Sequence, residues 1–95
     1  GDLSEPDAPK RLLSDIAAAG LPVDKLINNA GYGARGDFAE LDRDMQLGMV
    51  DLNCRALVAL AHGVLPQMTA RRSGAILNVA STAAFQPGPW MAVYY

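Results

Sequence analysis

Cysteine and histidine each occur only once in the 95 residues, as Cys54 and His62. A single cysteine cannot form a disulfide within the chain, so we predict a reduced thiol packed in the core and a cytoplasmic location. The lone histidine has no partner at metal-ligand spacing and is predicted to be a packed or surface residue. The sequence therefore predicts no metal site.

Neither sign of charge is in marked excess, because 8 lysines and arginines stand against 10 aspartates and glutamates, for a net charge of −2. This balance favours neither nucleic acid nor an anionic membrane as a partner. Long apolar runs are also missing. The longest, residues 56–65, is interrupted by His62 and Gly63 and has about half of the ~20 residues that cross a bilayer. We therefore expect no membrane span.

Apolar residues are abundant: they make up 51% of the chain, beside nine glycines and six prolines. That content excludes a disordered chain and predicts a packed core, while the length excludes two domains. The chain starts with Gly1 rather than methionine and stops at Tyr95 without a helix stop signal. We therefore expect residues 1–95 to be the central part of one domain, truncated at both ends.

The spacing of apolar residues predicts two helices and the beginning of a third. The first helix follows a cluster of N-cap residues at positions 4–7. The second is long, because apolar residues recur every 3.6 positions from 41 to 68, with Asp42 as its N-cap. Pro66 is expected to kink or end this helix, and the third helix is expected to begin near Trp90.

Three short apolar segments are predicted to be buried strands, at residues 2–3, 23–30 and 74–80. Strands and helices therefore alternate, with about three of each. Continuous apolar strands between helices are typical of a parallel sheet that helices cover on both faces. The predicted fold class is α/β, and in such sheets ligands bind beyond the carboxyl ends of the strands.

The segment 31–36, Gly-Tyr-Gly-Ala-Arg-Gly, has the G-x-G-x-x-G spacing of a dinucleotide-binding loop, with Asp51 twenty positions after its first glycine. In that motif the loop opens directly into a helix and the acid ends the next strand. Here the predicted helix starts later and contains Asp51. We therefore interpret 31–36 as a flexible loop beside the binding crevice rather than as a pyrophosphate site.

Three polar residues stand where chemistry is expected. Asn53 lies in the long helix among apolar residues, so its amide is expected to be half buried and to need partners. Ser81 ends a predicted strand, and Tyr94 lies one turn into the predicted final helix. A hydroxyl and a phenol in these places can handle a carbonyl oxygen, one donating a hydrogen bond and the other a proton. Each residue alone also has an ordinary structural explanation.

Taken together, these residues resemble the short-chain dehydrogenase/reductase family over essentially the whole chain. The resemblance is carried by Asn-Asn-Ala-Gly at 28–31, Asp-Leu-Asn at 51–53, Asn-Val-Ala-Ser at 78–81, and Tyr94. Twenty-eight positions separate Asn53 from Ser81, and thirteen separate Ser81 from Tyr94, distances that are similar to those in the family. The four motifs in this order make the resemblance specific.

The resemblance implies a Rossmann-like doubly wound parallel sheet that binds NAD or NADP, in an enzyme that moves a hydride between a secondary alcohol and a ketone. It implies that Tyr94 is the general acid and base, that Ser81 holds the substrate oxygen, and that Asn53 positions a water for proton relay. In the family a lysine follows the tyrosine by four positions, and the chain stops at Tyr95. We therefore expect the 95-residue chain alone to have no useful dehydrogenase activity.

The resemblance also implies residues that bind the cofactor near the strand ends. These are Asp2 and Leu3 for the adenine, Asn29, Ala30 and Gly31 for the adenosine part, and Tyr94. The implied partners are a small alcohol or carbonyl substrate and further copies of the chain, in a homodimer or homotetramer. Phe85, Trp90 and Met91 are candidates for lining an apolar substrate pocket, although core packing explains them equally well.

Two alternatives stay open. Thr82 and Tyr95 are also thirteen positions apart and carry the same functional groups as Ser81 and Tyr94, although the spacing from Asn53 favours the latter pair. The second alternative concerns the function: a protein that keeps this fold without the chemistry would be a non-catalytic NAD(P) sensor or scaffold.

Overall fold

Two short parallel strands form the sheet in the computed structural model, which describes residues 1–95. Strand β1 (Lys25–Asn28) pairs with β2 (Ala75–Asn78) along their whole length. At the end of this pairing the Asn28 side chain donates a hydrogen bond from Nδ2 to Oδ1 of Asn78, at 2.8 Å. The parallel pairing agrees with the predicted α/β class.

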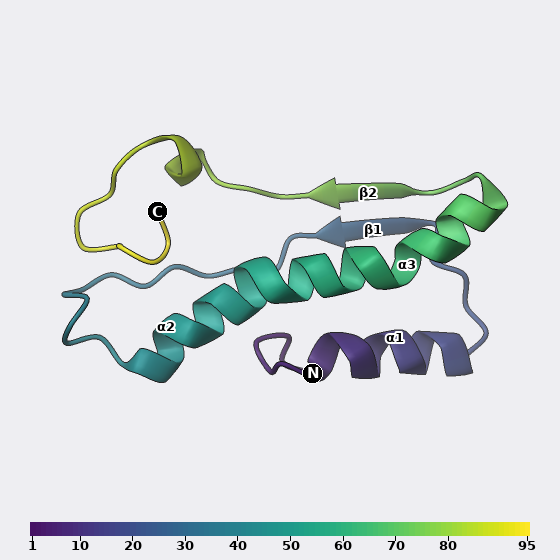
Figure 1. Ribbon diagram of the computed structural model, residues 1–95, viewed down its shortest axis with the longest axis horizontal. Coiled ribbons are helices and arrows are strands. Elements are labelled where there is room, and N and C mark those ends of the chain that lie inside the picture. The colour runs from purple at the N-terminus through teal and green to yellow at the C-terminus, as the bar shows by residue number, and fades with distance from the viewer.

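The expected burial of these strands on both faces is wrong, because helices cover only one face of the sheet. Helix α3 (Leu57–Arg71) contacts both strands, and Figure 1 shows it running alongside the sheet. The strand side chains that point away from α3 remain exposed to solvent. Ile27 is 61% exposed and Leu77 is 57% exposed. The molecule is consequently flat, with principal extents of 46 × 26 × 14 Å.

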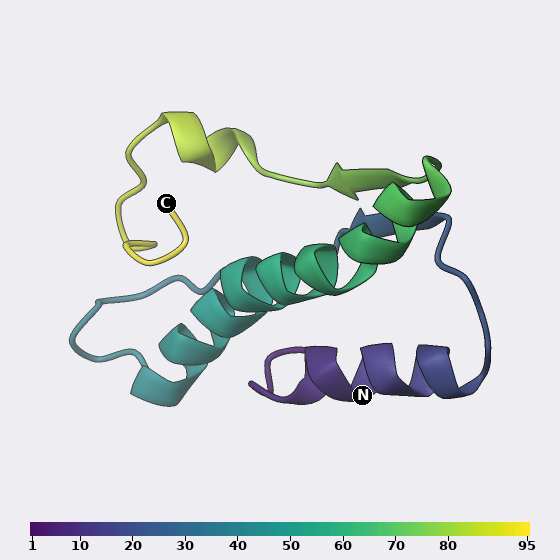
Figure 2. The same ribbon diagram turned by 45° about the vertical axis from the view of Figure 1, so that its right-hand side comes forward.

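Helix α1 (Ala8–Ala18) packs along the far side of α3 from the sheet, an arrangement that both Figures 1 and 2 show. Its apolar face is used as expected, since Leu13 reaches the backbone of Gly63 in α3. A Cβ atom on Gly63 would overlap a terminal methyl of Leu13. After the helix, Gly20 adopts a left-handed conformation with φ of 67°, which ends the element.

The long helix predicted from Leu41 runs without a break from Arg43 to Arg71. It consists of α2 (Arg43–Val50), a π-helical segment η1 (Asp51–Ala56), and α3. Asp42 is its N-cap as predicted, with the carboxylate accepting a hydrogen bond from the Met45 N–H at 2.7 Å. This side chain satisfies one of the free N–H groups at the start of the helix.

Of the two effects expected of Pro66, the structure excludes one, the end of the helix. Pro66 lies inside α3 without ending it, because both Pro66 and His62 are exposed and water can bond the His62 carbonyl that lacks a helical partner. The expectation for Cys54 is wrong. Cys54 is exposed rather than packed in the core, since the helix turns it away from the buried stripe. The buried residues of the stripe are Met49, Ala56, Leu60, Val64 and Met68.

The unbroken helix also bears on the membrane prediction. It has 29 residues and a mean hydropathy of 1.2 in its most apolar part, enough by length and composition to cross a membrane. The sequence estimate was too narrow because it considered only the run 56–65, whereas the helix continues through Pro66. A core helix meets the same criteria, and α3 packs against α1 and both strands as core helices do.

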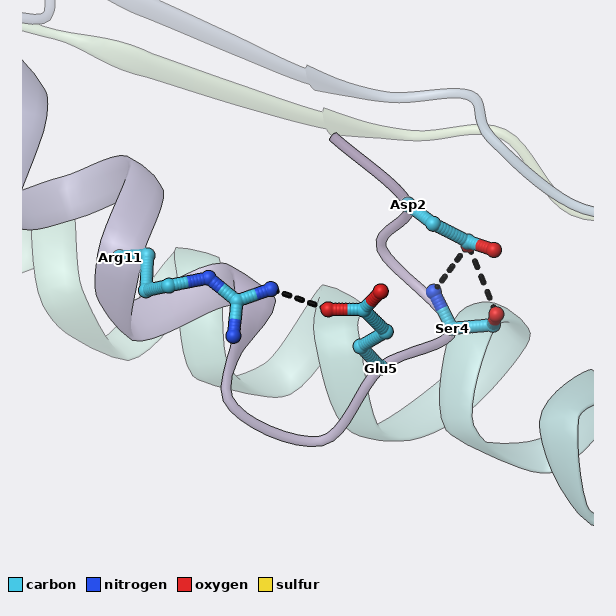
Figure 3. Close-up of polar contacts among 4 residues, drawn as sticks. All are labelled: Asp2, Ser4, Glu5 and Arg11. Carbon is cyan, nitrogen blue, oxygen red and sulfur yellow. Dashed lines mark hydrogen bonds and ion pairs between the residues drawn. The ribbon is translucent and has the colours of Figure 1, made fainter.

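The two ends of the chain also differ from prediction. Asp2 and Leu3 form a turn instead of a strand, because the Asp2 carboxylate accepts hydrogen bonds from the N–H and hydroxyl of Ser4, at 2.9 and 2.7 Å (Figure 3). The neighbouring Glu5 pairs with Arg11 of α1. No helix begins at Trp90, whose φ of 67° is incompatible with a right-handed helix, and residues 90–95 form turns.

Candidate functional site

A cavity of about 500 Å³ lies beyond the carboxyl ends of β1 and β2. The loops that follow the two strands both extend to the same end of the molecule (Figure 1). They line the cavity with residues 29–33 and with five residues of the segment 79–84, joined by Asn53, Tyr94 and Tyr95. The cavity thus stands where a parallel α/β sheet places its ligands.

Asn53 connects the helix to the loop after β1. Its Oδ1 accepts a hydrogen bond from the Tyr32 N–H at 3.1 Å, and its Nδ2 donates one to the Tyr32 carbonyl at 2.8 Å. The amide is half buried and engaged at both ends, as its position among apolar residues predicted. Because Asn53 lies in the π-helical segment η1, a local widening of the helix accompanies this contact.

Ser81 sits between β2 and a short 3-10 helix, η2 (Thr82–Phe85), for which it is the N-cap. Its Oγ accepts a hydrogen bond from the Ala83 N–H at 3.2 Å. The hydroxyl hydrogen is not used in this contact, so it remains available to donate to a molecule in the cavity. Thr82, the alternative to Ser81, does not line the cavity.

Tyr94 packs its ring against the loop after β1. A Cβ atom on Gly33 would lie 3.1 Å from Cδ2 of Tyr94 and 3.0 Å from the end of Met91, so a glycine here leaves room for the ring to approach this closely. Tyr95 stands beside it, edge to face, with the ring centroids 6.0 Å apart. Both tyrosines line the cavity.

The two loops are tied together by one backbone hydrogen bond. The N–H of Gly36 donates to the Trp90 carbonyl at 2.8 Å. This bond and the contact of Tyr94 with Gly33 bring residues 31–36 against 88–95. The segment with G-x-G-x-x-G spacing is therefore a wall beside the cavity, and Asp51 lies in the helix, paired with Arg55 at 2.8 Å.

Tyr32 is the residue of the site that sequence reasoning missed. Besides its two bonds with Asn53, its hydroxyl donates to the Met45 carbonyl at 2.6 Å, and a Cβ on Gly48 would come within 2.9 Å of that hydroxyl. The loop after β1 is thus held to the long helix at three points. A large aromatic residue between Gly31 and Gly33 was the available signal for such an anchor.

The structure separates the remaining predicted site residues. Asn29, Ala30 and Gly31 line the cavity, whereas Asp2 and Leu3 do not. Leu3 lines a second, mostly apolar cavity of about 180 Å³, which Asn29 and Ala30 also border. The expected pocket residues Phe85, Trp90 and Met91 lie outside both cavities, because the loop turns Phe85 outward until it is 90% exposed.

The turn at Asp2 affects the pKa of its carboxyl group. Hydrogen bonds from the Ser4 hydroxyl, and then from the Ser4 N–H, lower the pKa of the Asp2 carboxyl below its ordinary value. The carboxylate is fully exposed and already accepts both of these bonds.

No group of three or more histidine, cysteine or acidic side chains gathers anywhere in the chain, so the structure offers no ready set of metal ligands.

The comparison with protein families agrees with this arrangement. The model of the short chain dehydrogenase family matches residues 1–95. The chain belongs to this family. Among curated members, a short chain dehydrogenase of Pseudocercospora fijiensis is 37% identical over 95 residues, covering 98% of this chain and 31% of that protein. An uncharacterized oxidoreductase of Bacillus subtilis is 33% identical, covering 98% and 35%.

Solved structures of short-chain dehydrogenases share the fold. One of 4-hydroxyisoleucine dehydrogenase complexed with NADH and succinate is 29% identical with a TM-score of 0.90, over 99% of this chain and 41% of that one. A metagenomic short-chain oxidoreductase in complex with NADP is 31% identical with a TM-score of 0.87, over 98% and 42%. The predicted Rossmann-like fold is thus confirmed, and the chain spans between about a third and two fifths of these relatives' lengths.

Proposed function

We propose that this chain forms the proton-handling part of an NAD(P)-dependent oxidoreductase that acts on a secondary alcohol or ketone. One observation carries the proposal: Ser81 and Tyr94, thirteen positions apart in the segment after β2, line the same cavity at the carboxyl ends of the strands. Family membership and relatives whose structures hold NADH or NADP support it. A sensor or scaffold would not need both a tyrosine and a serine in the lining of one cavity.

In this proposal Tyr94 donates its phenolic proton to the carbonyl oxygen during reduction and takes it back during alcohol oxidation. Ser81 donates its free hydroxyl hydrogen to the same oxygen and so stabilises the charge that develops on it. The choice of Ser81 over Thr82 is supported by its place in the lining, whereas Tyr94 and Tyr95 both remain within the cavity. Neither phenol makes a hydrogen bond to another residue that would occupy it.

Asn53 is proposed to act chiefly through the loop. Its amide has two N–H donors and two oxygen lone pairs, of which Tyr32 takes one each. One donor and one lone pair remain for the water relay that the family resemblance implies. The main effect of Asn53 is then to keep Tyr32 in place, and with it Gly33, against which the Tyr94 ring packs.

The cavity residues fit part of a nicotinamide dinucleotide. Bound there, the nicotinamide would supply or accept the hydride. Asn29 is exposed at the strand end with an uncommitted side-chain amide, and small residues beside it leave room for a flat ring or a ribose. No cationic side chain lines either cavity, so binding of the pyrophosphate of NAD or NADP there would depend on N–H and hydroxyl donors. We propose that Asp2 and Leu3 meet the adenine, at the edge of the smaller cavity.

The test is turnover by the intact protein that contains this chain, measured as a change in NADH or NADPH absorbance with ketones and secondary alcohols. Tyr94→Phe should lower kcat by roughly 100-fold or more, because it removes the proton donor while keeping the ring. Tyr95→Phe is the matched control and should keep most of the activity. The reverse result would transfer the role to Tyr95, and full activity in both variants would refute a tyrosine acid.

Two further outcomes separate the alternatives. The 95-residue chain alone is expected to show no turnover. Cofactor binding by the intact protein without any turnover would instead favour a sensor or scaffold. The predictions of a cytoplasmic homodimer or homotetramer belong to the same proposal, and light scattering of the purified intact protein measures the oligomeric state.

A further inference from the structure

The Tyr32 side chain makes a contact with the long helix that no step of the proposed reaction uses. Its hydroxyl donates a hydrogen bond to the Met45 carbonyl in α2 at 2.6 Å. Its backbone N–H and carbonyl are bonded to Asn53, eight positions further along the same helix. Eight positions correspond to about two helical turns. Tyr32 therefore lies along the helix and is attached to it at both ends.

A gap on the helix surface admits the hydroxyl. Gly48 lies three positions after Met45 in α2, and a Cβ atom there would come within 2.9 Å of the Tyr32 hydroxyl. The next nearest atom outside the helix is Cβ of Ser4 at 3.9 Å, an ordinary contact distance. Inside a helix alanine is favoured over glycine by about 1 kcal/mol. Helix propensity thus opposes Gly48, and the Tyr32 hydroxyl is the one neighbour that a larger residue would crowd.

The position of Tyr32 affects two of the groups proposed to move the proton. Asn53, whose amide is proposed to hold the relay water, is bonded directly to the Tyr32 backbone. The next residue in the loop, Gly33, packs against the Tyr94 ring, since a Cβ atom on it would lie 3.1 Å from Cδ2 of that ring. Ser81, in contrast, is held within its own segment. A shift of Tyr32 along the helix would therefore displace Asn53 and Tyr94 relative to Ser81.

We propose that Tyr32 is a positioning residue for proton transfer, and that the bond from its hydroxyl to the Met45 carbonyl fixes Asn53 and Tyr94 in productive geometry. The proposal rests on the function proposed above and adds a residue that acts through others. Two of the three bonds between Tyr32 and the helix use backbone atoms, which any residue could supply. The hydroxyl bond is the contribution of the tyrosine side chain, and small misplacements of reacting groups cost large factors in rate.

Tyr32→Phe in the intact protein tests the proposal, because it keeps the ring and both backbone bonds. With a ketone substrate, kcat should fall on the order of 10-fold. The solvent deuterium isotope effect on kcat should rise, since a misplaced Tyr94 makes proton transfer the slower step. A variant that merely folds less well has fewer active molecules, each with the original isotope effect. Unchanged kcat, or a lower kcat with an unchanged isotope effect, would overturn the proposal.

Gly48→Ala disturbs the same bond from the helix side. It should also lower kcat and raise the isotope effect, although alanine is the better helix former. In a Tyr32→Phe background it should lower kcat no further, because the hydroxyl is already absent. Gly63→Ala is the matched control, since its methyl group crowds Leu13 instead and should leave the isotope effect unchanged. Additive losses in the double variant, or an equal rise in the control, would contradict the proposal.

Failure of the proposed function gives a different result. No turnover by the unchanged protein with ketones and secondary alcohols would refute the oxidoreductase function itself. Hydrogen exchange then decides on the contact of Tyr32 with the helix, since exchange does not depend on turnover. Faster exchange of the amides of residues 29–36 in both Tyr32→Phe and Gly48→Ala supports the positioning of the loop by the hydroxyl. Unchanged exchange in these variants would overturn it.

Discussion

At the scale of single residues, Asn53 shows why the type of side chain matters. Only an amide offers a donor and an acceptor in one plane, and Tyr32 uses both with its backbone N–H and carbonyl. A leucine would pack in the same half-buried place but would leave these two groups without partners. Asn53 thereby links the helix to the wall against which Tyr94 packs.

We expect Asn53→Asp to lower the free energy of unfolding by about 1–3 kcal/mol. The carboxylate can still accept from the Tyr32 N–H, but it cannot donate to the Tyr32 carbonyl and would face it with a negative charge. Urea denaturation followed by circular dichroism measures the change. Asn29→Asp is the matched control, because Asn29 is exposed and makes no side-chain hydrogen bond. An equal loss there would contradict the role of the Asn53–Tyr32 hydrogen bonds.

The turn at Asp2 gives a pH-dependent prediction. Because the pKa of Asp2 is lower in the folded chain than its ordinary value of 3.8, its carboxylate stabilises the turn above that value. The contribution is lost as the pH falls through the lowered pKa. A carbon NMR titration of the Asp2 carboxyl should show the low pKa, and Ser4→Ala should raise it towards 3.8. An unchanged pKa in Ser4→Ala would contradict the assigned cause.

At the scale of elements, the packing of α1 on α3 depends on a missing side chain. Gly63 lies in the middle of α3, where glycine disfavours a helix by about 1 kcal/mol relative to alanine. The close approach of Leu13 explains why a glycine is suited to that position. Helix propensity and helix packing therefore act in opposite directions at this residue.

A double-mutant cycle separates the two effects. Gly63→Ala alone should destabilise the chain by about 1–2 kcal/mol, because the new methyl group overlaps Leu13. In a Leu13→Ala background the same change should stabilise by up to about 1 kcal/mol, since only the helix propensity remains. Thermal or urea unfolding gives all four free energies, and a Gly63→Ala effect of the same sign in both backgrounds would show that the contact does not matter.

At the scale of the whole molecule, the helices lie to one side of a two-stranded sheet and leave much apolar surface open. Only 8 of the 95 residues are buried, so the stabilisation available from burial is small for this length. The outer face of the sheet carries Ile27, Leu77 and Val79, all at least half exposed. We therefore expect the isolated chain to be weakly stable and prone to associate through this face.

Two leucines test this expectation in the isolated chain. Leu60 is 6% exposed in the core stripe, and Leu60→Ala should cost about 2–5 kcal/mol, enough to abolish cooperative unfolding. Leu77 lies on the outer face, and Leu77→Thr should change stability by less than about 1 kcal/mol while reducing self-association. Circular dichroism and light scattering measure the two effects. Similar destabilisation by both changes would mean that the outer face is packed in solution.

The sequence predicted best those elements whose conformation depends on residues close to them in the chain. The 3.6-residue period marked the buried stripe of the long helix, and Asp42 marked its start, because both depend on residues within a few turns. The same reasoning failed at Trp90, where the apolar pattern favoured a helix. There the Gly36 N–H bonds the Trp90 carbonyl, and a contact between distant segments overrides the local preference.

For this protein, the sequence by itself determined the α/β class and the parallel order of the strands, because periodicity is a property of the chain, and the spacing of its motifs carried the family resemblance that singled out Asn53, Ser81 and Tyr94. Only the tertiary structure decided that Tyr32 is the anchor, that Asp2 and Leu3 stand apart from the larger cavity, and that the cavity lining is uncharged. These features depend on contacts between side chains that are dozens of residues apart in the sequence. Such residues come together only when the helix packs on the sheet.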